Sequence, residues 1–395
     1  MAGDVKFHAK TLKGLEPFLA DELKSLGAIR THIVNRGVDF YGGMALMYRV
    51  NLASRLALRV LCPVLQFEAG DQDTLYRNVK RFDWSLYLDN QMTFAIDPVV
   101  FSPHFNNSQF VAQRVKDGIA DRFRESTSLR PSVDRKQPDL LINVHISGTR
   151  VTVSLDSSGG SLHRRGYRTG QGYFEAPLNE VLAAGMVMIS GWEGRTPFLD
   201  PMCGSGTLAI EAALFASNIP PGIFRKQYGF ENWKDFDRDL MEHVAQRLAD
   251  EKEVVVPIIA RDKDLDAVEL TRRQVRQMDL QHIITVEKGD FADSAEMEGT
   301  TLIMNPPYGE RMKPADIDSL YGMIGSTLKH KFPESDAWIL SSSKKALGKV
   351  GLKPASKRLL FNGSLECSYV NYKTFRGNLK DHKAHSEGNQ KKSPI

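Results

Sequence analysis

The chain has 395 residues, of which 42% are hydrophobic and 25% charged, and its net charge is +4. This length predicts two or three globular domains, and the mild basic charge permits a polyanionic partner without requiring one. Cys62, Cys203 and Cys367 lie far apart without metal-ligand spacing, which argues against a zinc site and a disulfide framework. Because no apolar run approaches membrane-spanning length and the N-terminus lacks an apolar signal core, a cytoplasmic location is expected.

Residues 1–60 are expected to form a small α+β unit. A strand near Val5 precedes a helical stripe over residues 14–27, and Asn35-Arg36-Gly37 joins two strand-like runs into a hairpin. Residues 44–60 are predicted to be a second helix, because apolar residues recur there at helical spacing. Nothing in this part indicates a catalytic centre.

Residues 61–158 are expected to form a second unit in which strands and helices alternate. A helix capped near residue 107 carries Arg114 and Lys116, and Arg130 lies in a later loop. Such basic side chains can track phosphates without reading base sequence. A solvated surface with ordinary charges is the alternative, and charge counts alone favour it.

The next stretch, residues 157–168, is rich in glycine and basic residues, so a domain boundary is expected near it. It is either a flexible linker or a positive strip that contacts nucleic acid at the mouth of a catalytic domain. The candidate contacts in this strip are His163, Arg164, Arg165, Tyr167 and Arg168.

An apolar run that begins at Phe198 passes into a glycine turn and then into an apolar helix. Strand, glycine loop and helix form the first crossover of a doubly wound α/β sheet. Glycines let the backbone approach a ligand closely, and the helix N-terminus favours a negative group. The loop matches neither GxGxxG nor GK[ST], so a dinucleotide or phosphate-cradling loop is not indicated. The candidate ligand contacts are Asp200, Pro201, Cys203, Gly204, Ser205, Gly206 and Thr207.

Acidic residues follow the next two predicted strands. Asp262 comes after the second strand, where a carboxylate can accept both hydroxyls of a ribose. Asp264 either assists or caps the following helix, and the two interpretations are comparable. The third strand leads into Asp290 and Phe291.

The fourth predicted strand, residues 301–304, delivers Asn305-Pro306-Pro307-Tyr308 to the carboxyl edge of the sheet. Two prolines stiffen the loop and leave its carbonyls free to accept hydrogen bonds. The Asn305 amide oxygen and the Pro306 carbonyl can hold the two hydrogens of an exocyclic amino group, while Tyr308 offers a stacking face. A plain Pro-Pro turn is the alternative. Asn362-Gly363 later predicts a β-hairpin at the end of the sheet.

Three ordered motifs together resemble the large-subunit ribosomal RNA guanine-N2 methyltransferases. They are residues 161–168, 200–207 and 305–311, and the Asn-Pro-Pro-Tyr run also resembles the signature of amino-methyltransferases. The resemblance covers essentially residues 1–378, and it implies an α/β class I S-adenosylmethionine methyltransferase domain with a doubly wound, seven-stranded mixed sheet after an RNA-binding module. The implied division is a ferredoxin-like part (1–60), a THUMP domain (61–158), a linker (159–176), a Rossmann-like methyltransferase domain (177–378) and a disordered tail (379–395).

The resemblance also implies a cofactor and a substrate. The glycine loop would hold the amino-acid end of S-adenosylmethionine, Asp290 its adenine amino group and Phe291 the ring, with Asn305 near both cofactor and base. No metal is needed. The implied substrate is N2 of a guanosine in 23S ribosomal RNA or in a large-subunit precursor particle. Some family members append a second methyltransferase domain; this chain stops after the first, so a second modification is not implied.

Two other functions stay open from the residues. The tetrad does not distinguish a guanine amine from adenine N6 or cytosine N4 in DNA. A non-catalytic RNA-binding assembly factor whose pocket only holds a cofactor is the second alternative. The sequence does not identify the modified guanosine, protein partners or the oligomeric state.

Overall fold

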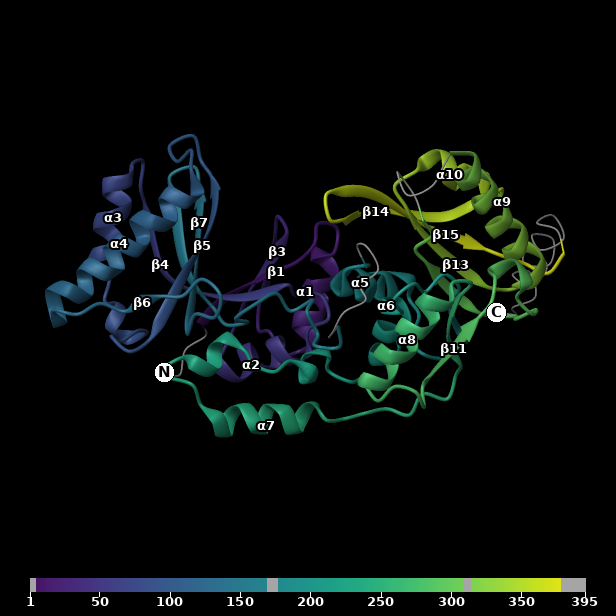
Figure 1. The fold of residues 1–395 in the computed structure, drawn as a ribbon, viewed down its shortest axis with the longest axis horizontal. Helices are drawn as coiled ribbons and strands as arrows, with labels where there is room; N and C mark the ends of the chain where they lie inside the picture. Colours follow the sequence, from purple (N-terminus) through teal and green to yellow (C-terminus); the bar gives the residue numbers. More distant parts are fainter. Residues whose placement is uncertain (1–4, 169–176, 308–313, 378–395) are drawn as a thin grey trace, which may run out of the picture. The chain divides into compact units, whose positions relative to one another are not determined.

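The computed structural model describes residues 5–168, 177–307 and 314–377, and Figure 1 shows its helices and strands. The chain divides into two compact units that are not consecutive in sequence. The first comprises Met1–Thr11, Leu19–Gly166 and Pro220–Ala249, and the second comprises Leu12–Phe18, Tyr167–Ile219 and Asp250–Ile395. Each unit therefore includes one segment that lies, in sequence, within the span of the other: Leu12–Phe18 belongs to the second unit and Pro220–Ala249 to the first. Domain boundaries that are contiguous in sequence do not describe these exchanged segments. The predicted tail and residues 169–176 of the predicted linker lie outside the described residues.

The first unit is built on an eight-stranded sheet with the order β2-β3-β1-β4-β8-β7-β5-β6. Its strands are β1 (Val5–Lys10), β2 (Thr31–Val34), β3 (Gly37–Gly42), β4 (Arg59–Glu68), β5 (Thr93–Phe101), β6 (Ser132–Val133), β7 (Leu140–Ser147) and β8 (Arg150–Asp156). Because β4 pairs antiparallel with both β1 and β8, one continuous sheet joins the two N-terminal parts of the chain.

Helices pack on this sheet and on one another. The helices are α1 (Glu16–Ser25), which begins in the exchanged segment, α2 (Met44–Ala53), α3 (Gln72–Arg81), α4 (Ser108–Thr127) and α7 (Arg238–Leu248). Helix α4 begins as the sequence predicts: the Asn107 side chain caps it by accepting from the backbone N–H groups of Gln109 and Phe110.

The helix predicted over residues 44–60 is wrong in its second half. Helix α2 ends at Ala53, and Ser54 adopts an extended backbone. Val60 and Leu61 are both buried, because they lie on opposite faces of β4 between two neighbouring strands. A short apolar run buried on both faces is compatible with helical spacing as well, so periodicity alone did not separate the two structures.

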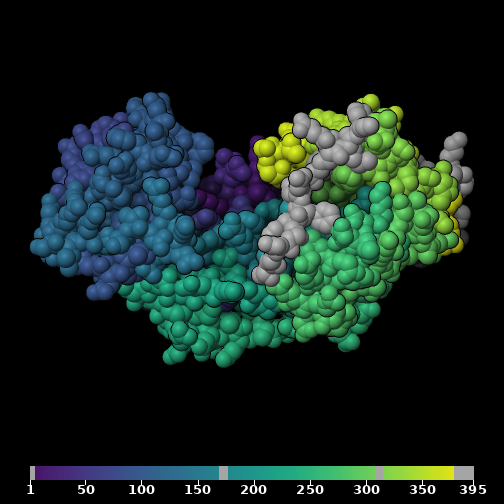
Figure 2. All heavy atoms as spheres, viewed as in Figure 1, coloured from purple at the N-terminus to yellow at the C-terminus, as the bar shows by residue number. Residues whose placement is uncertain are grey.

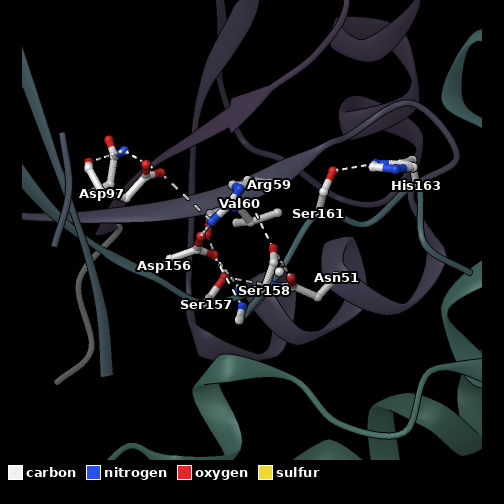
Figure 3. A network of polar contacts seen from close by, with 12 residues as sticks. Asn51, Arg59, Val60, Asp97, Asp156, Ser157, Ser158, Ser161 and His163 are labelled. Atoms are coloured by element: carbon white, nitrogen blue, oxygen red, sulfur yellow. Dashed lines mark hydrogen bonds and ion pairs between the residues drawn. The ribbon is translucent and has the colours of Figure 1, made fainter. Parts of the chain in front are cut away.

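A buried polar network fixes the chain where β8 ends (Figure 3). Ser157 and Ser158 are fully buried, and both bond to Asn51: its amide donates to Ser157 Oγ at 2.9 Å and accepts from Ser158 Oγ at 2.7 Å. The buried Asp156 carboxylate pairs with Arg59. The strip that begins at residue 157 is therefore anchored in the first unit at its start, unlike a flexible linker.

The second unit contains a seven-stranded mixed sheet with the order β11-β10-β9-β12-β13-β15-β14. Its strands are β9 (Phe198–Asp200), β10 (Ile258–Asp262), β11 (Ile284–Lys288), β12 (Thr301–Met304), β13 (Asp336–Ser341), β14 (Pro354–Asn362) and β15 (Leu365–Lys373). The first five run parallel and β15 runs antiparallel to β13. This arrangement confirms the predicted doubly wound sheet closed by a hairpin, whose turn joins Asn362 to its partner Leu365.

The helices of this unit are α5 (Glu180–Ser190), which precedes β9; α6 (Thr207–Ala216), α8 (Leu265–Gln277) and α9 (Pro314–Lys331), which lie between parallel strands; and α10 (Lys344–Lys349), which follows β13. Ile324 and Leu328 of α9 are fully buried against Leu302 and Met304 of β12. This packing fixes the end of β12, where the Asn305 loop begins. Among the described residues, no helix combines the length and apolar character that crossing a bilayer requires.

Candidate active site

The glycine loop between β9 and α6 is held by its own backbone and by two side chains. Gly206, with φ +76°, is the N-cap of α6, and its N–H donates to the Cys203 carbonyl at 2.7 Å. The Asp262 carboxylate accepts from the Gly204 N–H at 2.9 Å, and the Thr271 hydroxyl donates to the Gly204 carbonyl at 2.9 Å. The loop is thus tied to β10, the strand beside β9 in the sheet, and to α8, the helix that follows β10.

Asp200 is 1% exposed at the end of β9. Among the described residues, neither of its carboxylate oxygens has a partner at full hydrogen-bond geometry, although the backbone N–H groups of Met202 and Ala209 approach the carboxyl and lower its pKa in part. Burial raises the pKa of this carboxyl well above its usual range, and the nearby Asp262 carboxylate raises it further. A buried carboxylate of this kind is complementary to a cationic ligand group.

The other predicted acidic residues lie at the ends of the neighbouring strands. Asp264 is the N-cap of α8 and accepts from the Asp266 N–H at 2.8 Å, which confirms the cap interpretation while the residue also faces the cavity described below. Asp290 accepts from the Ala292 N–H at 3.0 Å. Phe291 beside it is buried in the core of the unit.

Asn305 follows β12 directly. Its side-chain oxygen is buried and has no hydrogen-bond partner among the described residues. Pro306 is buried and Pro307 is half-buried. Tyr308, the predicted stacking residue, and the rest of the motif through Arg311 lie outside the described residues.

One cavity of about 390 Å³ joins these elements, a size typical of small-molecule sites. It brings together the carboxyl ends of β9, β10, β11 and β12. The predicted site residues that line it are Asp200, Pro201, Cys203, Gly204, Ser205, Thr207, Asp262, Asp264, Asp290, Phe291, Asn305, Pro306 and Pro307. Asn305 and the glycine loop therefore line the same cavity.

Gly206 is the predicted contact that does not line this cavity. Other residues line it although sequence reasoning missed them: Pro177, Leu178, Met202, Leu208, Lys263, Ala267, Gly289, Leu320 and Met323. Leu320 and Met323 lie on α9, where their apolar character fits core packing equally well. No chemical signal in the sequence marks them as cavity residues.

The loop requires glycine at position 206 for a structural reason. A Cβ atom at this position would lie 2.6 Å from Thr271 Cγ2, and the positive φ is unfavourable for any side chain. We expect Gly206→Ala to lower the free energy of unfolding by about 1–3 kcal/mol, measured by urea titration.

The matched control is Gly363→Ala in the hairpin turn, where φ is +64° and a Cβ would meet nothing within 4 Å. This variant has the cost of a side chain at positive φ but no steric clash, so it should lower the free energy of unfolding by less than Gly206→Ala does. Thr271→Ser removes the clashing methyl and keeps the hydroxyl, and should partly rescue Gly206→Ala. If Gly206→Ala and Gly363→Ala lowered the free energy of unfolding equally, the clash with Thr271 would have no cost, which would contradict this prediction.

The predicted RNA contacts of the first unit are largely compensated by acids. Arg114 pairs with Asp73 at 2.8 Å, and its guanidinium lies over the Tyr76 ring. Lys116 pairs with Asp117 at 2.9 Å. Both belong to α4, which lies at the surface of the first unit on the face shown in Figure 2. Arg130 is exposed.

The strip over residues 161–168 does not present all its basic residues to solvent. Arg165 and Tyr167 are each 1% exposed, which corrects their prediction as RNA contacts. The Arg165 guanidinium donates to the Leu162 carbonyl at 2.9 Å and the Arg55 carbonyl at 2.6 Å. Its burial stabilises the local chain and leaves it no surface for a phosphate.

The remaining strip residues differ from one another. Arg164 is exposed, and His163 is half-buried and hydrogen-bonds with Ser161 at 2.6 Å. Arg225, in the exchanged segment of the first unit, donates to the Ser161 and Arg164 carbonyls, both at 2.9 Å. Arg168 belongs to the second unit, where it forms an ion pair with the buried Glu180.

Comparison with known families agrees with this architecture. Residues 6–61 match the RlmL ferredoxin-like domain, residues 69–156 match the THUMP domain, and residues 165–371 match the methyltransferase domain described as RMKL-like. The chain belongs to the RMKL-like methyltransferase family. The predicted ferredoxin-like, THUMP and methyltransferase modules are thereby confirmed.

Individual relatives extend the match. The chain is 38% identical to a ribosomal RNA large subunit methyltransferase K/L of Syntrophotalea carbinolica, over 94% of this chain and 54% of the relative. It is also 38% identical to a candidate RNA methyltransferase of Synechocystis, over 93% of this chain and 97% of that protein. The chain thus spans about half the length of the K/L relative and nearly all of the second.

A solved structure shows the same fold. The crystal structure of SMU.472, a methyltransferase candidate complexed with S-adenosylhomocysteine, is 29% identical with a TM-score of 0.86. The match covers 96% of this chain and 100% of that one.

Proposed function

We propose that the cavity binds S-adenosylmethionine and that the protein methylates the exocyclic N2 of a guanosine in 23S ribosomal RNA. The observation that carries the proposal is the buried Asn305 oxygen, an acceptor without a partner among the described residues, in the same cavity as the glycine loop.

The residues present fit this cofactor. Asp200 is a buried carboxyl without a partner at full hydrogen-bond geometry among the described residues, which suits a ligand with an amino group and a positive sulfur. Asp262 lies at the end of β10, where a carboxylate meets ribose hydroxyls, although its two oxygens already accept from the Gly204 and Asp264 N–H groups. Asp290 and Phe291 would take the adenine end.

Bound there, S-adenosylmethionine supplies an electrophilic methyl group on sulfur. The chain's contribution is to orient the acceptor amine, whose lone pair is delocalised into the purine ring. Asn305 Oδ1 and the Pro306 carbonyl would each accept one amine hydrogen, which favours a pyramidal nitrogen whose lone pair points at the methyl group. Transfer would form the N–C bond as the S–C bond breaks, with S-adenosylhomocysteine as the leaving group, and the cationic nitrogen would lose a proton to solvent without a strong base.

The RNA assignment is supported by the THUMP match and by the ribosomal RNA named for the K/L relative. We propose 23S ribosomal RNA or its precursor particle as the partner. A target base would have to leave its stack, at a cost of a few kcal/mol that is smallest in loops.

The test is to incubate the purified chain with tritiated S-adenosylmethionine and three substrates. The first two are undermethylated 23S ribosomal RNA and large-subunit precursor particles, both from a strain in which the gene for this protein is deleted. The third is naked DNA. Digestion to nucleosides followed by mass spectrometry identifies the product. N2-methylguanosine from RNA or particles is the expected result.

N6-methyl-2′-deoxyadenosine or N4-methyl-2′-deoxycytidine from DNA would replace this function with that of a DNA amino-methyltransferase. Cofactor binding by calorimetry without transfer to any substrate would instead favour an RNA-binding assembly factor.

A further inference from the structure

Arg168 bonds to side-chain and backbone groups inside the second unit and is mostly buried there. Its Nε lies 3.2 Å from Glu180 Oε1, and its Nη2 donates to the Leu178 carbonyl and to Thr207 Oγ1, both at 2.8 Å. The Arg168 side chain is 17% exposed and that of Glu180 is 3% exposed. The prediction of Arg168 as an RNA contact is therefore replaced by a role inside this unit.

These contacts connect two walls of the cavity. Leu178 precedes α5 and Thr207 is the first residue of α6, and both line the cavity beside the glycine loop. The planar guanidinium offers donors in fixed directions, so it can bond to both residues while Glu180 balances its charge.

The contact with Thr207 also sets the direction of a proton. A hydroxyl has one donor hydrogen and two acceptor lone pairs. Because Thr207 Oγ1 accepts from Arg168, its own hydrogen is available to donate elsewhere, either to Ser205 Oγ at 3.3 Å or into the cavity. A cationic donor polarises the hydroxyl and strengthens that donation.

We propose that Arg168 is a positioning residue that aims the Thr207 hydroxyl at the carboxylate of the cofactor's amino-acid end. Thr207 lies at the N-terminus of α6, where the helix dipole also favours an anionic group. The inference rests on the proposed cofactor site, and it assigns Arg168 to recognition of one end of the cofactor.

The test compares two ligands by calorimetry. S-adenosylhomocysteine carries the amino-acid end, whereas 5′-methylthioadenosine lacks it. We expect Arg168→Gln to weaken binding of S-adenosylhomocysteine by roughly 10- to 100-fold, the scale of a hydrogen bond to a charged group. Binding of 5′-methylthioadenosine should change by less than about 2-fold, because its contacts lie elsewhere. Arg168→Lys keeps the charge but not the fork of donors, so an intermediate loss is expected.

The matched control is Arg195→Gln, which removes an 80% exposed arginine of the same unit that pairs with Glu193. Affinity for both ligands should stay at the wild-type value. Equal weakening of both ligands by Arg168→Gln, or of neither, would overturn the proposal.

A double-mutant cycle tests the proposal even if the Arg168→Gln variant does not fold. If Arg168 acts through Thr207, the losses from Arg168→Lys and Thr207→Ala should not add, and Thr207→Ser, which keeps the hydroxyl, should lose less affinity than Thr207→Ala. Additive losses would overturn the proposal. Wild-type protein that bound neither ligand would instead refute the proposed cofactor site.

Discussion

Asn305→Ala should reduce methyl transfer at least ~100-fold, the scale of losing one preorganised polar contact in an active site. The alanine removes the buried oxygen that awaits a donor in the cavity. The loss should appear in single-turnover rates with cofactor and RNA both saturating, because the contact is made to the acceptor amine.

Cofactor binding separates this effect from a general disturbance of the site. S-adenosylhomocysteine should bind Asn305→Ala with nearly the wild-type affinity, and the melting temperature should be close to that of wild type. Unchanged turnover would remove Asn305 from the mechanism. Reduced turnover with an equal loss of cofactor affinity would make Asn305 a cofactor contact only.

Asp200→Asn should weaken S-adenosylhomocysteine binding at least ~10-fold and, at the same time, stabilise the ligand-free protein. Both effects come from one buried carboxylate beside Asp262. Its charge is unfavourable without a ligand and favourable against the cofactor's amino group. Asparagine has nearly the same shape without the charge.

The pH dependence of stability checks the cause. The pKa of Asp200 is raised in the folded protein above its ordinary value of 3.8, so the unfolded chain ionises first as the pH rises. Below pH 3.8 the carboxyl is largely protonated in both states and the carboxyl penalty is absent. As the pH rises above 3.8, the unfolded chain ionises while the folded protein does not, so the free energy of unfolding falls until the pH passes the folded-state pKa. The advantage of Asp200→Asn in urea titrations should therefore grow from about pH 4 upwards.

Asp250→Asn is the matched control, because Asp250 is exposed and outside the cavity. It should leave ligand affinity at the wild-type value. An Asp200→Asn protein that is less stable than wild type at pH 7, or that binds the ligand equally well, would contradict this explanation.

The sequence predicted the candidate site better than its surroundings. Asp200, Asp262, Asp290 and Asn305 lie at or just after the carboxyl ends of parallel strands. Such ends meet at one edge of a sheet, so the shared cavity follows from the order of the strands alone. Leu320 carries no comparable signal, because an apolar residue on a helical stripe looks the same in a core and in a cavity.

Charge was the least reliable guide. Arg165 and Arg168 were grouped with exposed Arg164 because composition does not report which way a side chain points. Arg114 is paired with Asp73, 41 residues away in the sequence, and no local pattern predicts such a pair. Sequence reasoning located the basic strip but not the buried acceptors and acids that its members contact.

The exchange of segments between the two units bears on how the chain can fold during synthesis. The first unit includes Pro220–Ala249, so it is incomplete until the ribosome has passed residue 249. The second unit needs Leu12–Phe18, where Leu15 packs against Gly185, so this short piece must wait for a helix made much later. Neither unit can be obtained whole by cutting the chain at a single point, and release of the N-terminal modules alone would leave both incomplete.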